Sequence, residues 1–247
     1  MDAYDRIALA ELELWKLKMQ QAPGLLDKVS KGVQDKVNQA IPERVHKVIT
    51  VSIQKMIEAV IFGAKYTTSA PLVNVPLGSR EQQLEEHISF YRKTAVTEGA
   101  ITGAGGILLG LADFPLLIAL KIKFLFKAAS IYGFDTHEYK ERLYLLHIFQ
   151  LAFSSRKRRR EIFSILENWD EYIVKLPEKA EEFDWRTFQQ EYRDYIDLVK
   201  MAQLFPFIGA VVGAVANYKL VNHLGETAKN AYRMRYFASG EDFSIMK

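Results

Sequence analysis

Two polar residues, Asp113 and Asn217, stand inside otherwise apolar stretches of this 247-residue chain. A carboxylate and an amide enclosed by apolar side chains could bind a ligand together or, with a histidine brought close by folding, begin proton transfer. Buried groups of this kind more often cap helices and satisfy backbone hydrogen-bonding groups. Asp113 is therefore the candidate for an uncharacterised enzymatic activity, while the pair is also consistent with a ligand site or with structural caps.

The residue types that usually carry catalysis occur without the spacing that catalysis needs. Cysteine is absent, which excludes thiolate zinc sites, iron–sulfur clusters and cysteine nucleophiles. No segment matches a metal-binding histidine motif, a nucleophile elbow or a phosphate-binding glycine loop. We therefore favour a non-enzymatic protein with no metal and no cofactor. The histidines, all outside such motifs, are His46, His87, His137, His147 and His223.

One run of basic residues could contact an anionic partner. Residues 156–160 are five consecutive cations in a chain whose net charge is only +3. A basic residue near an acidic lipid surface contributes about 1 kcal/mol, so the run predicts contact with an anionic membrane. Nucleic acid is disfavoured because the run has no interleaved aromatic residues. The alternative is a solvated helix start, partly neutralised by Glu161 and Glu167. The run consists of Arg156, Lys157, Arg158, Arg159 and Arg160.

Two glycine-rich apolar segments must position Asp113 and Asn217. The first covers residues 99–120, and the second covers residues 201–218, which contain no charged residue. A glycine inside a helix costs about 1 kcal/mol relative to alanine, so these segments form helices only where close packing compensates. Glycines four residues apart leave a bare face, and we expect the two segments to pack on one another. The glycines concerned are Gly99, Gly103, Gly106, Gly110, Gly209 and Gly213.

The first segment is long enough to cross a bilayer, but two of its residues argue against this. A carboxylate such as Asp113 near the bilayer centre costs about 2.5–3.5 kcal/mol, and Pro115 interrupts a helix. The alternative makes Asp113 the N-cap and places Pro115 in the first turn of a helix that ends at Gly133. Residues 99–120 would then be two short buried helices joined at residues 112–113. We favour this soluble or peripheral interpretation.

The rest of the chain predicts an all-α protein. Apolar residues recur every three or four positions, as in residues 4–19, whereas no segment alternates with the period of a strand. Ser79 with Gln82, and Asp135 with Glu138, have the spacing of N-terminal helix caps. We expect a single compact multi-helix domain over residues 1–247, with the two glycine-rich segments at its centre. It would comprise an N-terminal helical arm at 1–70, a core at 79–237 and a tail at 238–247.

Three groups of residues together resemble the EcsC protein family. The order and spacing of their small residues extend the resemblance from about Tyr91 to Phe237, and the preceding helices are compatible with it. It implies a bacterial protein, often encoded beside an ABC-type transporter that has an ATPase subunit and a membrane-spanning subunit. It implies no enzymatic activity, so the matching residues carry over as signature positions of unknown role. The groups are residues 105–115, with Gly106, Gly110, Asp113 and Pro115; residues 132–135; and residues 206–217, with Pro206, Gly209, Gly213 and Asn217.

These observations lead to one favoured function and two alternatives. We expect a non-enzymatic accessory protein in the cytoplasm, at the inner face of the cytoplasmic membrane, with an anionic lipid surface and ABC transporter subunits as partners. No secretory signal follows Met1, which is consistent with this location. The first alternative is a soluble carrier that encloses an acyl chain or another apolar ligand near the glycine-rich segments. The second is an enzyme that uses Asp113.

Overall fold

The first helix, α1 (Ala3–Gln20), begins at a reciprocal cap. The Asp2 carboxylate accepts a hydrogen bond from the Asp5 backbone N–H at 2.8 Å, and the Asp5 carboxylate accepts one from the Asp2 N–H at 3.0 Å. These bonds satisfy two donors that a helix start leaves without partners. Helix α1 buries Ala8 and Leu12 of its predicted stripe. The computed structural model describes residues 1–21, 43–62, 70–104, 106–197, 201 and 210–239.

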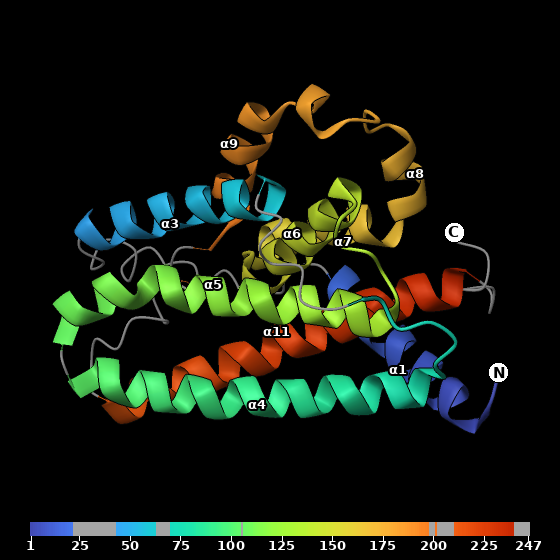
Figure 1. Cartoon of the computed structure of the whole chain (residues 1–247), viewed down its shortest axis with the longest axis horizontal. Helices are drawn as coiled ribbons and strands as arrows, with labels where there is room; N and C mark the ends of the chain where they lie inside the picture. Colours follow the sequence, from blue (N-terminus) through green and yellow to red (C-terminus); the bar gives the residue numbers. More distant parts are fainter. Residues whose placement is uncertain (22–42, 63–69, 105, 198–200, 202–209, 240–247) are drawn as a thin grey trace.

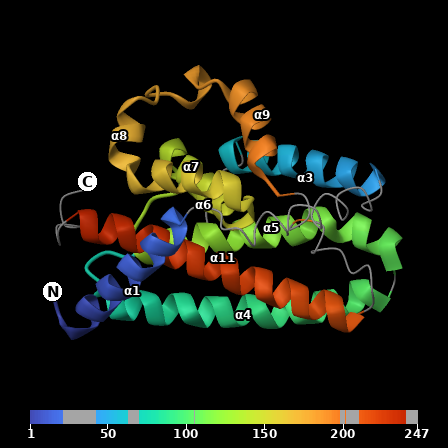
Figure 2. The same cartoon turned by 180° about the vertical axis from the view of Figure 1, so that it is seen from behind.

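Three long helices form the layer against which α1 packs. They are α4 (Leu77–Ala104), α5 (Gly106–Tyr132) and α11 (Ala210–Ala238), which lie side by side (Figure 1). Helix α11 packs along most of α4. In Figure 2, α1 crosses α11 on the face of this layer that is turned toward the viewer. The close approach of α4 and α11 uses Gly225, since a Cβ there would lie 2.7 Å from Ile88 Cδ1.

A second group of shorter helices covers the other face of α5 (Figure 1). Helix α6 is its centre, and every α6 residue from Leu143 to Phe153 is buried. Helix α3 runs beside α5 and buries its predicted stripe of Val45, Ile49, Ile53, Ile57 and Ile61. The elements of this group are α3 (Glu43–Phe62), α6 (Tyr139–Phe153), α7 (Arg156–Glu167), α8 (Trp169–Val174), the 3-10 turn η2 (Ala180–Glu182) and α9 (Trp185–Tyr195).

The all-α fold class is confirmed. Within the described ranges the chain forms α-helices and one short 3-10 turn but no strand, and its only β-type pairing is an isolated antiparallel bridge between Ser154 and Ile196. None of the described helices combines the length and the uninterrupted apolar sequence that crossing a bilayer requires. Residues 99–120, the segment whose length alone would have allowed a span, are divided between α4 and α5.

Both predicted N-terminal caps in the middle of the chain are wrong. Helix α4 begins at Leu77, two residues before Ser79, whose N–H donates to the Pro76 carbonyl at 3.1 Å. Helix α6 begins at Tyr139, and the Asp135 carboxylate instead accepts from the His137 N–H at 2.9 Å in a local turn. Aspartate and serine form such local hydrogen bonds in turns as readily as in caps, so spacing alone does not separate the two.

The predicted helix break at residues 112–113 is also wrong. Helix α5 runs from Gly106 to Tyr132 with Pro115 inside it, so Asp113 is an interior helical residue and not an N-cap. Proline removes one backbone donor from a helix, but burial of Phe114, Leu117 and Ile118 on both sides of it compensates for that loss. The predicted end of this helix is correct, since Gly133 follows Tyr132 with φ +94°.

Candidate functional site

The structure divides the first glycine-rich segment between two helices. Gly103 lies in the last turn of α4, whereas Gly106 and Gly110 lie in the first two turns of α5. Residues 99–120 therefore form neither one continuous helix nor two helices joined at residues 112–113. Their glycines surround the connection between α4 and α5, where two long helices reverse direction.

The remaining signature residues are described unequally. Gly213 lies in the first turn of α11, Pro115 lies inside α5, and Asn217 is buried further along α11. Pro206 and Gly209 lie outside the described residues, as does the side chain of Asp113. The enzymatic role of Asp113 stays a prediction for this reason.

Asn217 joins the two glycine-rich regions through Lys121, a residue that belongs to none of the motifs described above. The Lys121 ammonium donates to Asn217 Oδ1 at 3.0 Å and lies 3.4 Å from the Leu117 carbonyl oxygen in its own helix. Lys121 and Asn217 are both buried, so the bond ties α5 to α11 inside the protein. The signal for Lys121 was its position, because it falls on the same helical face as Leu117, Ile118 and Leu125.

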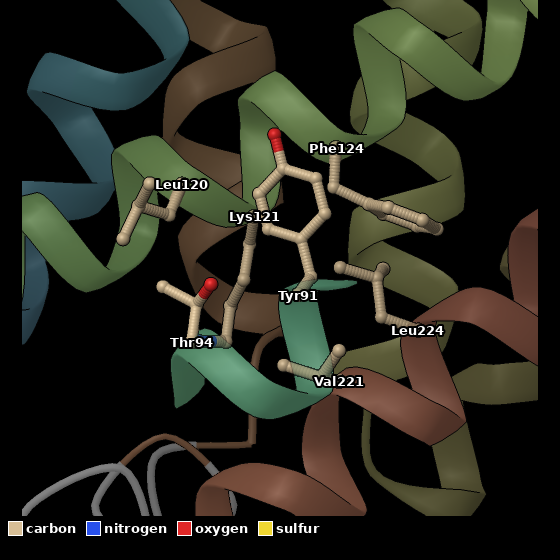
Figure 3. A pocket seen from close by; sticks show the side chains of 7 residues that line it. All are labelled: Tyr91, Thr94, Leu120, Lys121, Phe124, Val221 and Leu224. Atoms are coloured by element: carbon tan, nitrogen blue, oxygen red, sulfur yellow. The ribbon is translucent and has the colours of Figure 1, made fainter. Parts of the chain in front are cut away.

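The space beside Lys121 is too small for an organic ligand. Its side chain extends toward Thr94, next to the ring of Tyr91 (Figure 3). The cavity has a volume of about 10 Å³, which is room for a single water molecule. This region is therefore part of the packed interior. Its lining residues are Tyr91, Thr94, Leu120, Lys121, Phe124, Val221 and Leu224.

A larger apolar groove lies between α3 and α5. Its volume is about 360 Å³, within the range of small-molecule pockets, and it includes the signature residue Pro115. Leu116 lines it with 57% of its surface exposed, and Lys55 and Ser52 are its polar residues. The remaining lining side chains are apolar: Met56, Ala59, Val60, Ile118, Ala119 and Ile122. This groove can hold an apolar chain and place a negative charge near Lys55.

The basic run forms the first turn of α7 and is partly used inside the protein. Arg158 pairs with Glu161 at 3.0 Å, and its guanidinium lies 4.7 Å from the centre of the Tyr195 ring. Arg159 donates to the Lys18 carbonyl at 3.4 Å, whereas Arg160 is exposed. The side chains of Arg156 and Lys157 lie outside the described part of the chain.

The predicted neutralisation of the basic run is half correct. Glu161 does pair with it, but Glu167 forms its ion pair with Lys16 of α1, at 3.1 Å. The run lies at the N-terminus of α7, which is the positive end of the helix dipole. Positive side chains at this end destabilise the helix.

A buried ion pair, which no sequence motif indicated, joins α4 and α11. Arg233 forms two parallel bonds to Glu81, both 2.6 Å long, and a third to Glu11 of α1 at 2.9 Å. The hydroxyls of Tyr4 and Tyr132 donate to the same Glu81 carboxylate at 2.7 and 3.1 Å. Partial burial, and then the bond to Glu81, raises the pKa of Tyr4 to about 12.

A second ion pair lies next to the first. Arg235 pairs with Glu141 of α6, and the other oxygen of Glu141 accepts from the Tyr232 hydroxyl at 2.8 Å. The Arg235 guanidinium also lies 3.6 Å from the centre of the Phe134 ring. These charges satisfy one another, so both pairs hold helices together. No metal-binding group of histidines and carboxylates occurs among the residues that the structure describes.

Comparison with known proteins extends the resemblance to nearly the whole chain. A model of the EcsC protein family matches residues 6–237, which span α1 to the last turn of α11. The chain is 45% identical to "Protein EcsC" of Bacillus subtilis (strain 168) over 236 residues, covering 94% of this chain and 95% of that protein. It is 33% identical to "Uncharacterized protein YdbA" of the same organism over 141 residues, covering 57% and 52%. No solved structure matches.

Proposed function

The chain belongs to the EcsC protein family, and from this premise we propose that it is a non-enzymatic helical accessory protein of an ABC-type transporter. In this proposal the protein acts at the inner face of the cytoplasmic membrane. The transporter link rests on the family resemblance, which implies a gene often found beside transporter genes. The membrane contact rests on the molecule itself.

The observation that carries the membrane contact is the apolar groove between α3 and α5. It keeps Leu116 and Pro115 exposed on a helix that is otherwise among the most apolar of the chain. Exposed apolar side chains beside a lysine suit a lipid whose acyl chain enters the groove and whose anionic headgroup approaches Lys55. Phe62, at the end of α3, is a further exposed apolar side chain on one of the two helices that line the groove.

The basic run supplies a smaller electrostatic contribution than five lysines or arginines in solution would. Arg158 and Arg159 already have partners in Glu161, Tyr195 and the Lys18 carbonyl, so moving them to headgroups breaks existing contacts. Arg160 is exposed and is the described residue of the run best placed to contact lipid phosphates. We therefore assign the main affinity to the groove and a salt-sensitive part to the run.

Vesicle sedimentation tests the apolar part of the proposal. Purified protein is mixed with phosphatidylcholine vesicles that contain or lack phosphatidylglycerol. Leu116→Glu places a charge in the groove and should remove most binding. Val174→Glu, at an apolar side chain 83% exposed on α8, is the matched control and should bind like the unmodified protein. Equal binding by both variants would show that the groove does not contact lipid.

Charge reversal tests the electrostatic part. Arg160→Glu should weaken binding to the anionic vesicles only, and the binding that remains should decrease less with added salt than that of the unmodified protein. Arg186→Glu, an exposed arginine on α9, changes the net charge equally and serves as the control. If both reversals weaken binding to the same extent, the run has no special role and net charge alone matters.

A soluble carrier of an acyl chain is the second candidate, because the volume of the same groove suits an apolar ligand. Native mass spectrometry of protein purified without detergent should then show a bound species that Leu116→Glu loses. Fractionation of the cell lysate separates the two candidates. Recovery of the protein with the membranes, with only part of it released by high salt, supports the accessory protein, whereas recovery entirely in the soluble fraction supports the carrier.

A further inference from the structure

Helix α1 has a second apolar face that the structure leaves exposed. Ile7, Leu14 and Leu17 are 60%, 62% and 59% exposed, and Ala3 and Ala10 are exposed as well. These residues recur at intervals of four and three, the spacing that keeps side chains on one side of a helix when it pairs with another helix. The buried residues Ala8 and Leu12 lie on the opposite side, against α11 and α4. We call residues 3, 7, 10, 14 and 17 the outer stripe.

The outer stripe is accessible to a partner. Helix α1 lies across α11 on the near side of the molecule in Figure 2, and none of the described helices lies in front of it. Charged residues of both signs border the stripe on one side, with Arg6 and Glu13 both exposed. Helices that lie on an anionic membrane carry mostly lysine and arginine beside their apolar face, so the mixed border disfavours a lipid surface as the occupant.

We propose that the outer stripe binds a second copy of this chain, with the two α1 helices antiparallel. In that arrangement Ala3 faces Leu14 of the partner subunit, and Ile7 faces Ala10 of the partner subunit. Each contact then joins a small residue to a large one, so the helices approach closely without a gap. The same register places Arg6 beside Glu13 of the partner subunit, and symmetry repeats the ion pair.

The alternative registers are less favourable. If the antiparallel pair is shifted by one heptad, Glu13 lies beside the partner's Glu13. If the two helices are parallel, Ala3 lies against the partner's Ala3, and residues of like charge lie next to each other along the border of the stripe. The complementary charges therefore select one register and the opposite direction of the two chains. Because the contact involves a single helix from each subunit, the buried area is small and the dimer should dissociate on dilution.

Sedimentation velocity across the micromolar concentration range tests the dimer. The unmodified protein should change from monomer to dimer as its concentration rises. Leu14→Glu should raise the dissociation constant at least about tenfold, because symmetry places the new charge in the apolar interface twice, against Ala3 of the partner subunit at each end. Val174→Glu, on α8, should leave it unchanged. A protein that stays monomeric throughout, or a dimer that persists unchanged in Leu14→Glu, would overturn the proposal.

Charge exchange tests the register. Arg6→Glu and Glu13→Arg should each weaken the dimer, because like charges then meet across the interface. The double variant Arg6→Glu/Glu13→Arg restores opposite charges and should recover the original dissociation constant. A lipid occupant would give a different result, since Glu13→Arg adds positive charge and would strengthen binding to anionic vesicles, whereas it should weaken the dimer. Association that depends on Leu14 only when vesicles are present would likewise reject the homodimer.

Cross-linking tests the direction of the helices, and the cysteine-free chain makes it simple. Ala3→Cys mixed with Leu14→Cys should form a disulfide-linked dimer under mild oxidation. Ala3→Cys alone should not, because the two substituted positions would then lie about 16 Å apart along the antiparallel pair. Rapid cross-linking of Ala3→Cys alone would show parallel helices and overturn the proposed arrangement.

Discussion

Arg233 holds Glu81 in a two-bonded ion pair, with Nε–Oε1 and Nη2–Oε2 distances both 2.6 Å, although the residues are 152 positions apart. Glu81 lies in the second turn of α4 and Arg233 near the end of α11, so the pair fixes the register of these two helices. Both side chains are buried. Removing either one leaves an uncompensated charge away from water.

The first prediction concerns this ion pair. Arg233→Met should lower the free energy of unfolding by about 3–5 kcal/mol, because Glu81 then stays buried without its cation. The double variant Glu81→Gln/Arg233→Met should lose much less unfolding free energy, because neither of its two substituted side chains is charged. Urea unfolding followed by circular dichroism measures both values. Equal losses in the single and double variants would mean that the pair adds packing and not charge compensation.

The second prediction concerns pH. Burial lowers the pKa of His147 to about 4, so the imidazole is neutral in the folded protein. Between about pH 6.5 and pH 4 the unfolded chain binds a proton at this position that the folded protein excludes. The stability that His147 contributes is therefore complete above about pH 6.5 and is lost as the pH falls toward 4, by up to roughly 3 kcal/mol.

Unfolding in urea at a series of pH values measures this effect. His147→Leu should flatten the dependence between pH 6.5 and 4. A smaller slope should remain in His147→Leu, because burial also lowers the pKa of His87. An unchanged slope in His147→Leu would contradict the assignment.

The third prediction concerns Gly133, which ends α5 with φ +94°. A Cβ at this position would lie 2.8 Å from the Leu72 carbonyl oxygen and 2.9 Å from Arg80 Nη1. Gly133→Ala should therefore lower the free energy of unfolding by about 1–3 kcal/mol. Gly78→Ala is the control, because its Cβ would make an ordinary 3.4 Å contact with the Tyr4 ring and helix propensity favours alanine. Thermal melting should give Gly133→Ala a lower Tm than the unmodified protein and Gly78→Ala an equal or higher Tm.

The fourth prediction concerns the buried bond between Lys121 and Asn217. Asn217→Leu keeps the side-chain size but removes an acceptor of the Lys121 ammonium, and should cost about 1–3 kcal/mol of unfolding free energy. Lys121→Met/Asn217→Leu removes both polar groups and should recover part of that loss. If the double variant is less stable than Asn217→Leu alone, the lysine has a stabilising role beyond this bond.

The apolar periodicity predicted the helices well but not their ends. The stripe of α3 is buried as its spacing indicated, because a residue's side of a helix depends only on its position in the turn. Helix ends depend on competing local hydrogen bonds, as at Asp135, and on tertiary burial, as at Pro115 inside α5. Neither the competing local hydrogen bonds nor the tertiary burial can be inferred from the spacing of two residues.

The buried charges were missed because each looks like a surface residue in its own segment. Glu81 stands between Arg80 and Gln82, and its partner Arg233 is on another helix. Its spacing from Leu77 and Leu84 did place it on the buried face, which was a usable signal. The identity of its partner could not be inferred, since pairing across 152 positions depends on how α4 and α11 pack. The α3–α5 groove depends in the same way on two separate helices.

The contact of Arg233 with Glu11 constrains when this protein can fold during its synthesis. The two residues are 222 positions apart, and α1 and α11 are the first and last of the described helices. During translation, α1 and α4 are therefore synthesised long before α11. Glu11 and Glu81 stay in water until Arg233, their partner, has been added to the chain. Closing so long a loop is slow, and the face of α4 that packs against α11 stays uncovered until it closes, whereas α5 can already pack on α3, α4 and α6. The layer of α4, α5 and α11 can therefore assemble only once α11 has been synthesised.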